Sequence, residues 1–379
     1  MSSTDDSYWY YPALRAKAGE FDGLNALSRD IADRIRPRFL IPPPKEIDST
    51  LGRAPRKDEI IGGIGNRIAR SWAGREALVD PRYLLEDFGD AEIDSWLPRI
   101  FEIGSRVGAK MTPVFAVDKV DSLRLSAFKS AIAASGSDVQ VALRIPYDFD
   151  NQLIARSRLA ISDLGLEPSR CVALIDLCGA TLDLQDAVVG FVQDRFSDLQ
   201  DAAPWRQIIF QASNFPETNP AKKSEIALVR RAEWEIWKKV ASPKEGLSSG
   251  LIFGDYGADY ADLKLGNNRA RPIRHHRYTT SAGWYVVRED DINDTSEAMT
   301  AVCDRIVKSG HFAGRGFSEA DAQIFRQAHR TSKGPGRSSD WRAVNTTHHI
   351  THVVRELGKL NGVDLPFGRT DASEQLELI

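Results

Sequence analysis

Short apolar runs, rich in β-branched and aromatic residues, alternate along the chain with longer segments of helical periodicity. This alternation is typical of parallel strands whose connecting helices pack outside the sheet. Eight runs have the composition of strands: Tyr10–Ala16, Pro37–Ile41, Met111–Val117, Val139–Ile145, Cys171–Leu177, Gln207–Ala212, Leu251–Phe253 and His276–Thr280, with Leu78–Asp80 as a weaker competitor. Eight parallel strands form a (β/α)8 barrel, so the pattern predicts an α/β fold with a single TIM-barrel-like core.

The segments between the predicted strands carry apolar stripes at helical spacing. One stripe runs from Ile93 to Ile103 and another, which includes Leu184, runs from Leu182 to Val192. Each stripe requires a sheet to cover it. A further segment, Ala227–Val240, carries two tryptophans among alternating charges, and this spacing favours packing of the indoles over ligand binding.

Two stretches fit the alternation poorly. Pro42–Arg75 is rich in proline, glycine and charge and follows the second strand, so we interpret it as a long loop or lid. After Gly310, Ser318 is a suitable N-cap for a short helix at Ala320–His329, and a final helix is expected from about Thr347 to Leu360. The expected organisation is a barrel over residues 1–308 with a lid at 42–75, a helical extension at 309–368 packed on the barrel, and a flexible tail at 369–379.

Composition narrows the classes of partner. The 50 basic and 53 acidic residues nearly balance, which excludes a globally basic nucleic-acid binder, so any site for a polyanion must be local. Cys171, Cys178 and Cys303 have no CxxC spacing, which argues against a disulfide framework or a cysteine-rich zinc site and favours a reducing cytoplasm. The first residues lack a secretory signal pattern, and no long uncharged apolar run occurs. We therefore expect a cytoplasmic protein without a membrane partner.

Functional side chains of a (β/α)8 barrel lie at the C-terminal ends of the strands and in the loops that follow. The predicted strand ends select Lys17, Glu20, Arg144, Asp176, Gln211, Ser213, Asp255, Tyr256, Arg277 and Tyr278. We expect these side chains to point into one mouth.

Four of these residues are the candidates for catalysis: Lys17, Glu20, Asp176 and Asp255. Glu20 begins the helix after the first strand, where the helix dipole alone favours a carboxylate, so a catalytic role and an ordinary charged first turn both stay open. Asp176 ends an apolar run, where a buried charge is costly unless it is paired. Pairing with Arg144 or Lys17 and a role in the site are the two alternatives.

The segment from Lys264 to Tyr278 is the most basic part of the chain, with five lysines and arginines and no acid. Arginines bind phosphate through a fork of donors, and the loops after the seventh and eighth strands are the usual phosphate site of such barrels. A solvated basic loop is the alternative. Nearby aromatic residues either stack on bases or flank a hairpin turn at Thr280–Gly283. The predicted ligand-binding residues are Arg144, Gln211, Tyr256, Arg274, Arg277, Tyr278, Arg288 and His349.

Two histidines, His348 and His352, lie four residues apart on the face of the last helix opposite its apolar stripe. Such a pair can chelate zinc, but a metal site still needs a third ligand, no cysteine stands close in sequence and the HExxH glutamate is absent, so we predict no metal and favour proton transfer. The chain also lacks a Walker A motif, a GxSxG elbow and a dinucleotide fingerprint. The sequence therefore specifies no cofactor.

Four blocks, in order and over nearly the whole chain, resemble the Beta protein family of T-even phages and bacterial genomes: YYPALRAKAGE, HHRYTTSAGWYVVRE, GFSEADAQI and SSDWRAVNTTHHITHVVREL. The resemblance implies little about activity, because the family is largely without an assigned one. It implies a role in phage–host conflict, because the family occurs in phages, prophages and bacterial mobile or defence regions. The chain departs from the expected family pattern at Glu289 and Ala320, where glycine is expected. The shared blocks contain Tyr11, Lys17, Glu20, Arg277, Tyr278, Arg288, Asp321, Trp341, His348 and His349.

The leading hypothesis is an enzyme-like barrel whose mouth binds a phosphorylated small molecule, a nucleotide or a nucleic-acid end. Arg144, Arg274 and Arg277 would contact the anion, Glu20 and Asp176 would transfer protons, and Lys17 would be an electrostatic partner. The rival is a non-catalytic binding or sensor subunit of an antiphage system, with a nuclease or other effector encoded nearby as its protein partner. A third alternative is an assembly protein that forms symmetric oligomers.

Overall fold

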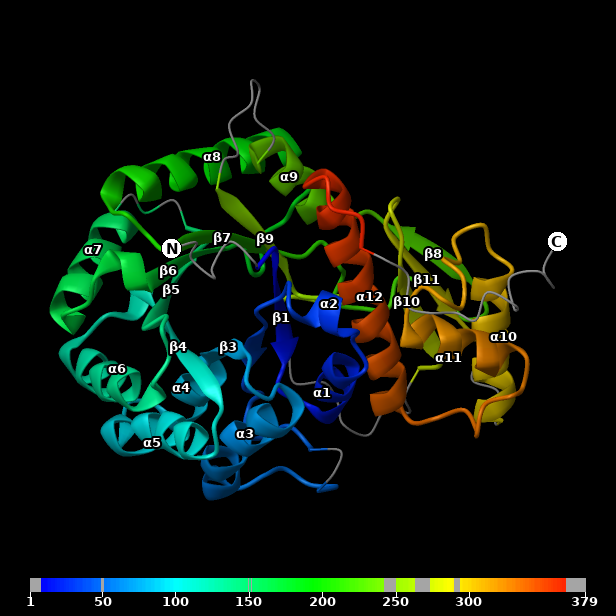
Figure 1. Ribbon diagram of the computed structural model, residues 1–379, viewed down its shortest axis with the longest axis horizontal. Helices are drawn as coiled ribbons and strands as arrows, with labels where there is room; N and C mark the ends of the chain where they lie inside the picture. Colours follow the sequence, from blue (N-terminus) through cyan, green and yellow to red (C-terminus); the bar gives the residue numbers. More distant parts are fainter. Residues whose placement is uncertain are drawn as a thin grey trace.

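Eight parallel strands close into a barrel in the structure, a computed structural model (Figure 1). The structure describes residues 8–48, 51–148, 150, 152–241, 250–262, 273–289 and 294–365. The barrel strands, in order around the barrel, are β1 (Tyr10–Arg15), β2 (Arg38–Leu40), β3 (Glu76–Asp80), β4 (Lys110–Ala116), β5 (Val141–Pro146), β6 (Cys171–Asp176), β7 (Gln207–Ala212) and β9 (Leu251–Asp255), and β9 pairs with β1. The predicted TIM-barrel-like core is confirmed.

Helices surround the barrel on its outside (Figure 1). They are α1 (Ala18–Asn25), α2 (Arg29–Ala32), α3 (Lys57–Ser71), α4 (Arg82–Phe88), α5 (Ile93–Arg106), α6 (Ser122–Ser135), α7 (Leu153–Leu164), α8 (Gln185–Ala202) and α9 (Ala232–Ala241). The apolar stripe of α5 is buried as predicted, but Leu184 precedes α8 and is 76% exposed, so it does not belong to the second stripe. Trp234 and Trp237 pack on Phe253 with ring centroids 4.9 and 5.3 Å away, which confirms a packing role.

One strand was assigned to the wrong sheet. The weak competitor Leu78–Asp80 lies in β3, between β2 and β4, and completes the barrel. The predicted eighth strand is instead β10 (His275–Thr279), which pairs antiparallel with β11 (Trp284–Arg288), and β11 pairs with β8 (Ile226–Val229). The physical difference is burial: β3 is buried at four successive positions, as a parallel strand covered on both faces must be, whereas β10 alternates.

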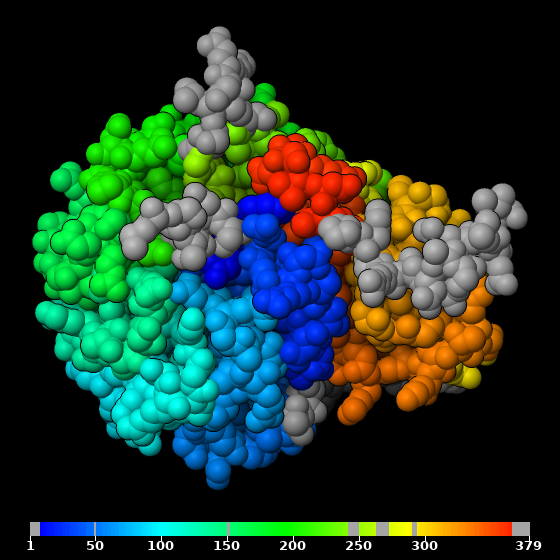
Figure 2. All heavy atoms as spheres, in the orientation of Figure 1, coloured from blue at the N-terminus to red at the C-terminus, as the bar shows by residue number. Residues whose placement is uncertain are grey.

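The small sheet β10–β11–β8 stands beside the barrel, and the last three helices, α10 (Thr295–Val307), α11 (Glu319–Ala328) and α12 (Ser338–Leu360), complete the described chain. Helix α12 lies between α1 and the small sheet, and the space-filling view shows it against the α1 region (Figures 1 and 2). Among the described residues, no helix has both the length and the apolar character that crossing a bilayer requires.

Several local predictions for this C-terminal part are confirmed. Thr280 and Gly283 close the hairpin turn, and the Ser318 hydroxyl caps α11 by accepting from the Asp321 N–H at 3.2 Å. Helix α12 begins nine residues before the predicted start at Thr347, at Ser338. The expected tail at 369–379 lies outside the described residues.

The predicted lid is only partly a loop. The described residues of 41–48 and 51–56 form turns and coil after β2, but the second half of the predicted lid is helix α3. Three glycines disfavour a helix there by propensity, yet Ile61, Ile64 and Ile68 are buried on one face. Gly65 allows α3 to approach α5 closely, because a Cβ at this position would lie 2.5 Å from the Cα of Gly104.

Gly65→Ala is expected to lower the free energy of unfolding by roughly 1–3 kcal/mol, because its Cβ would overlap the backbone of α5. Gly62→Ala on the same helix is the control, since no atom lies within 4 Å of its Cβ. Its added helix propensity should raise the free energy of unfolding by about 0.5–1 kcal/mol. Urea unfolding measures both, and equal stabilities would contradict the close approach of α3 and α5.

Candidate functional site

The inside of the barrel changes from apolar to charged along its axis. Side chains alternate along each strand, so every second residue points into the barrel. The middle is filled by Tyr11, Leu78, Val114, Ala142, Val172, Leu174 and Ile209. Toward the C-terminal end, the next inward positions of β2, β3, β6 and β7 are Arg38, Asp80, Asp176 and Gln211, all buried. A layer of buried charged and polar side chains therefore forms the floor of the mouth, at the C-terminal end of the barrel.

Arg38 is the centre of this charged layer. Its guanidinium donates to Asp80 Oδ2 from Nε at 3.1 Å and from Nη2 at 2.5 Å, to Asp176 Oδ2 at 3.1 Å, and to Gln211 Oε1. Burial by itself would raise the pKa of Asp80 and of Asp176, but Arg38 and Arg82 hold both pKa values below normal. Both carboxylates are therefore ionised, and Arg38 links them.

Asp176, a predicted catalytic residue, is held by a tyrosine hydroxyl and three arginines. The Tyr256 hydroxyl donates to Asp176 Oδ1 at 2.5 Å, and Arg144 Nη1 and Arg82 Nη2 lie 3.8 and 3.9 Å from Oδ2. Of the two predicted ion-pair partners, Arg144 is therefore the one found here, whereas Lys17 lies 2.6 Å from Glu46. Gln211 and Tyr256 belong to the same cluster, as the predicted mouth requires.

A pocket with only basic charged residues in its wall opens beside this cluster, and we call it the basic pocket. It lies at the ends of β3, β4 and β5 and is lined by Arg82, Leu85, Phe115, Ala116, Lys119, Arg124, Phe128 and Arg144. Of these basic residues, only Arg144 was selected from the sequence. Arg82 and Arg124 follow the strand ends inside helices α4 and α6, and Lys119 lies just after β4, so a search of each βα connection would have found them.

A second pocket, the rim pocket, lies over the ends of β1, β2 and β9. Its charged wall consists of Arg15, Glu20, Asp259 and Arg342, and Tyr256 joins it to the mouth. Burial raises the pKa of Glu20, although Arg342 lies 3.8 Å away and opposes the shift. Burial would also raise the pKa of Asp259, but Arg15, Arg342 and Arg277 hold it well below its usual range.

Arg277 reaches this rim from the small sheet. Its Nη1 donates to Asp259 Oδ1 at 2.5 Å, and Arg342 Nη1 donates to Asp259 Oδ2 at 2.7 Å. Burial lowers the pKa of Arg277, although Asp259 opposes the shift. Arg277 is thus beside the mouth despite belonging to another sheet. The nearby Ser213 hydroxyl donates to the Asp259 carbonyl at 2.8 Å.

Asp255 does not point into the mouth, so this expectation is wrong. The inward position of β9 is Gly254, where a Cβ would lie 3.4 Å from Gln211 Nε2, and alternation turns Asp255 outward toward α12. There Asp255 Oδ2 lies 3.0 Å from His349 Nε2, and Oδ1 accepts from the Tyr10 hydroxyl. The predicted ligand-binding residue His349 is therefore buried between the barrel and the small sheet, where its Nδ1 lies 2.8 Å from Thr279 Oγ1.

Three other predicted ligand-binding residues form hydrogen bonds around the small sheet and its helices, away from the centre of the mouth. Tyr278 donates to Asp321 Oδ1 at 2.6 Å, so it lies away from the mouth. Arg274 donates to Thr295 Oγ1 at 3.0 Å, and Arg288 donates to the Ala221 carbonyl at 3.2 Å. The remaining basic residues of the predicted phosphate segment, Lys264, Arg269 and Arg271, lie outside the described residues.

Helix α12 is covered by α1 on one side and by the small sheet and α11 on another, so the face that carries His348 is buried. His348 is buried, stacks on Tyr278 with ring centroids 3.8 Å apart, and contacts Asp321 Oδ2 at 3.0 Å. The predicted opposite face is therefore a packing face against the small sheet and α11. His352 Nε2 lies 3.4 Å from Glu356. Across the described residues, no group of three histidine, cysteine, aspartate or glutamate side chains is arranged to hold a metal ion.

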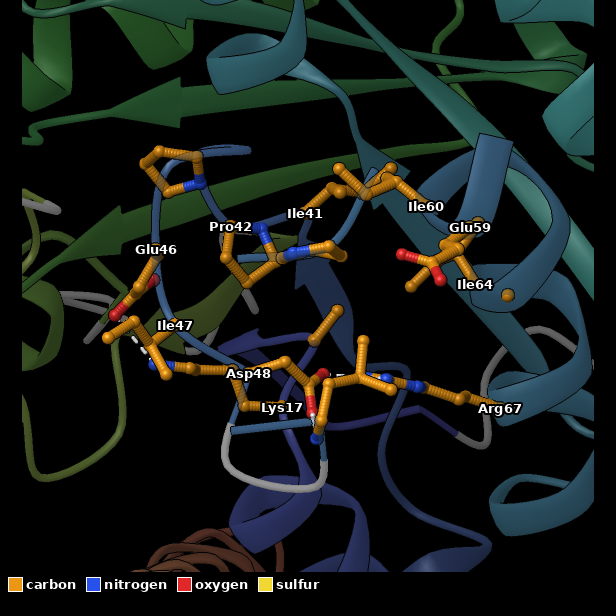
Figure 3. Close-up of a pocket in the computed structure, with 15 residues that line it drawn as sticks. Lys17, Ile41, Pro42, Glu46, Ile47, Asp48, Glu59, Ile60, Ile64 and Arg67 are labelled. Atoms are coloured by element: carbon orange, nitrogen blue, oxygen red, sulfur yellow. Dashed lines mark hydrogen bonds and ion pairs between the residues drawn. The ribbon is translucent and has the colours of Figure 1, made fainter. Parts of the chain in front are cut away.

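Lys17 lies in the wall of a third pocket, the loop pocket, between the connection after β2 and helix α3 (Figure 3). Lys17 Nζ donates to Glu46 Oε1 at 2.6 Å. The pocket is lined mainly by isoleucine, leucine and proline side chains. Lys17 and Glu20, neighbours in sequence, therefore line two different pockets at the same end of the barrel.

Comparison with known proteins finds similarity to a family model, to a phage protein and to a solved glucanase structure. The model of the family described as Beta protein matches residues 10–355. Protein beta of Enterobacteria phage P4 is 20% identical over 361 residues, which cover 92% of this chain and 94% of that protein. A xyloglucan-specific β-1,4-glucanase of family GH5, from a ruminal metagenomic library, has a TM-score of 0.40 and 9% identity over 67% of this chain and 85% of its own.

Arg38→Met is expected to lower the free energy of unfolding by roughly 3–5 kcal/mol, because Asp80 and Asp176 then remain buried without their cation. Arg330→Met is the control: it removes an ion pair with Glu297 whose side chains are 61% and 48% exposed, and it should cost about 0–1 kcal/mol. Urea unfolding at neutral pH measures both. Similar small losses in the two variants would contradict the buried charge network.

Proposed function

This chain belongs to the Beta protein family, and from that premise we propose that it acts in phage–host conflict by binding a phosphorylated ligand at the mouth of its barrel. The relative in phage P4, alike over nearly its whole length, supports the phage setting. The ligand class is a phosphorylated small molecule, a nucleotide or the end of a nucleic acid.

The observation that carries this proposal is the wall of the basic pocket, with four basic side chains and no acidic one. Inside the mouth, three guanidinium groups contact Asp80 and Asp176, and Arg144 Nη2 also lies 3.9 Å from Asp118 Oδ1, whose side chain is 29% exposed. Guanidinium groups present paired donors that match phosphate oxygens. A site of this kind attracts an anion although the whole chain has a net charge of −3.

The role that we assign to Asp176 is to position these arginines. Its low pKa and its contacts with Arg38 and Tyr256 keep it an anion at neutral pH, which makes it a weak base. Arg144 and Arg82 lie at the edge of its contact range, at 3.8 and 3.9 Å. Both arginines therefore keep donors for a phosphate group.

Pyrophosphate and nucleoside triphosphates are expected to raise the thermal midpoint of the wild type, because they bind the folded state only. Arg144→Gln should weaken this binding by roughly 10- to 100-fold, the loss expected for one charge-assisted contact. Arg330→Gln, which alters an exposed arginine on the far part of the chain, is the control and should bind as the wild type does. Calorimetric titration gives the affinities, and equal binding by the two variants would contradict the assignment of the basic pocket.

A second candidate function, hydrolysis of the bound ligand, is favoured by the two carboxyl groups of the rim pocket. Glu20 and Asp259 line the same pocket, and their pKa values are shifted in opposite directions, upward by burial and downward by arginines. A carboxyl group whose pKa is raised suits the role of a general acid, and one that stays ionised suits the positioning of nearby cations. Glu20 would supply a proton to the leaving group, while Asp259 would stay ionised and hold Arg15, Arg277 and Arg342.

Glu20→Gln is expected to lower turnover of a phosphate ester by roughly 100-fold or more, because the amide cannot donate the proton to the leaving group. Its affinity for the ligand should stay within about threefold of wild type, since the substitution keeps the side-chain shape. Phosphate release and calorimetric binding are measured on the same preparations. Wild-type binding without turnover would refute hydrolysis and leave the rival proposal, a non-catalytic sensor subunit that partners a nuclease or other effector.

A further inference from the structure

The loop pocket is a small apolar cavity that takes no part in the anion site. It lies between the connection after β2 and helix α3, and its volume is about 70 Å³ (Figure 3). Isoleucine, leucine and proline side chains form most of its lining, and its charged side chains are Lys17, Glu46, Asp48, Glu59 and Arg67. Most of this wall is apolar, and its polar groups form a short series of ion pairs.

The volume limits what can enter. An apolar cavity of roughly 150 Å³ accepts benzene, so a cavity of half that size accepts a short aliphatic chain rather than an aromatic ring. The isoleucines of α3 and the prolines of the connection provide walls without donors or acceptors. A ligand of a few methylene groups therefore fits the apolar part.

The charges around the cavity are already balanced. Asp48 Oδ2 accepts from Arg67 at 2.6 Å, and Glu59 accepts from Arg53 through two contacts at 2.7 and 2.8 Å. A charged ligand would lose its hydration without meeting an uncompensated charge, which is costly in an apolar site. The cavity therefore favours a neutral ligand.

Lys17 and Glu46 supply the polar end. Lys17 Nζ uses one N–H for Glu46 Oε1, and an ammonium group carries three. Glu46 Oε2 is shielded from solvent and accepts no hydrogen bond from any described residue. The last torsion of a glutamate is soft, so a small rotation can turn this oxygen toward the cavity. A free donor thus stands beside a free acceptor at the end of an apolar cavity.

We infer that the loop pocket binds a neutral aliphatic carboxamide, whose N–H groups bond Glu46 and whose carbonyl accepts from Lys17. This ligand chemistry occurs in small carboxamides and at the end of a glutamine side chain. The proposal concerns a different pocket from the anion site, so neither depends on the other.

The test uses a matched ligand series and a matched pair of variants on the full chain. Butyramide, butyrate and butylammonium have nearly the same size. Butyramide carries both donors and an acceptor, butyrate carries acceptors only, and butylammonium carries donors only. Gly63 lines the cavity and Gly62 does not, while a Cβ at either position meets no atom within 4 Å. Gly63→Leu therefore fills the cavity, and Gly62→Leu adds the same side chain to the same helix outside it.

Ligand-observed NMR titration should show that butyramide binds the wild type and Gly62→Leu equally, and at least tenfold more weakly to Gly63→Leu. Butyramide should also bind more tightly than butyrate or butylammonium. Nα-acetylglutamine methylamide distinguishes a glutamine side chain of a protein from a free small carboxamide as the ligand. If it binds as tightly as butyramide, the ligand is a protein side chain. If it binds more weakly, the ligand is a free carboxamide. The proposal is overturned if butyramide fails to bind, binds Gly63→Leu as well as wild type, or binds no better than the charged ligands.

Discussion

The buried guanidinium of Arg38 is the interaction on which the mouth of this barrel depends. A charge inside a barrel is tolerated only when its partners hold it on several sides, and here β3, β6 and β7 each supply one. Gly254 on β9 allows the backbone of β1 and the Gln211 amide to approach closely, because a Cβ there would lie 2.7 Å from the Tyr11 carbonyl oxygen and 3.4 Å from Gln211 Nε2. The arrangement of the charged groups at the mouth thus depends on the one side chain of Arg38.

Strand alternation then decides which residues reach the mouth. Asp255 and Tyr256 are adjacent in sequence, yet one faces α12 and the other contacts Asp176 inside the mouth. The outward residue helps to hold the small sheet and α12 against the barrel through His349. Polar residues at the end of a strand therefore serve two purposes, and only the inward ones belong to the proposed anion site.

The barrel was predictable from the sequence because its strands are nearly continuous apolar runs. The prediction failed where this pattern weakens: the apolar run of β3 has only three residues between Glu76 and Asp80, and β10 resembles a strand although burial alternates over its first four residues. For the mouth, Arg144, Asp176, Gln211 and Tyr256 were found from strand ends. Arg38 was not, because it begins a strand and its role arises from partners more than 40 residues away, which no local pattern reveals.

The most direct test of the anion site is to locate a heavy phosphate analogue in crystals of the protein. Crystals soaked in tungstate would be measured at a wavelength where tungsten scatters anomalously. The account predicts an anomalous peak within contact distance of Arg82, Arg124 and Arg144 that disappears in crystals of Arg144→Gln. Tungstate bound only elsewhere on the surface, or a peak that persists unchanged in the variant, would contradict it.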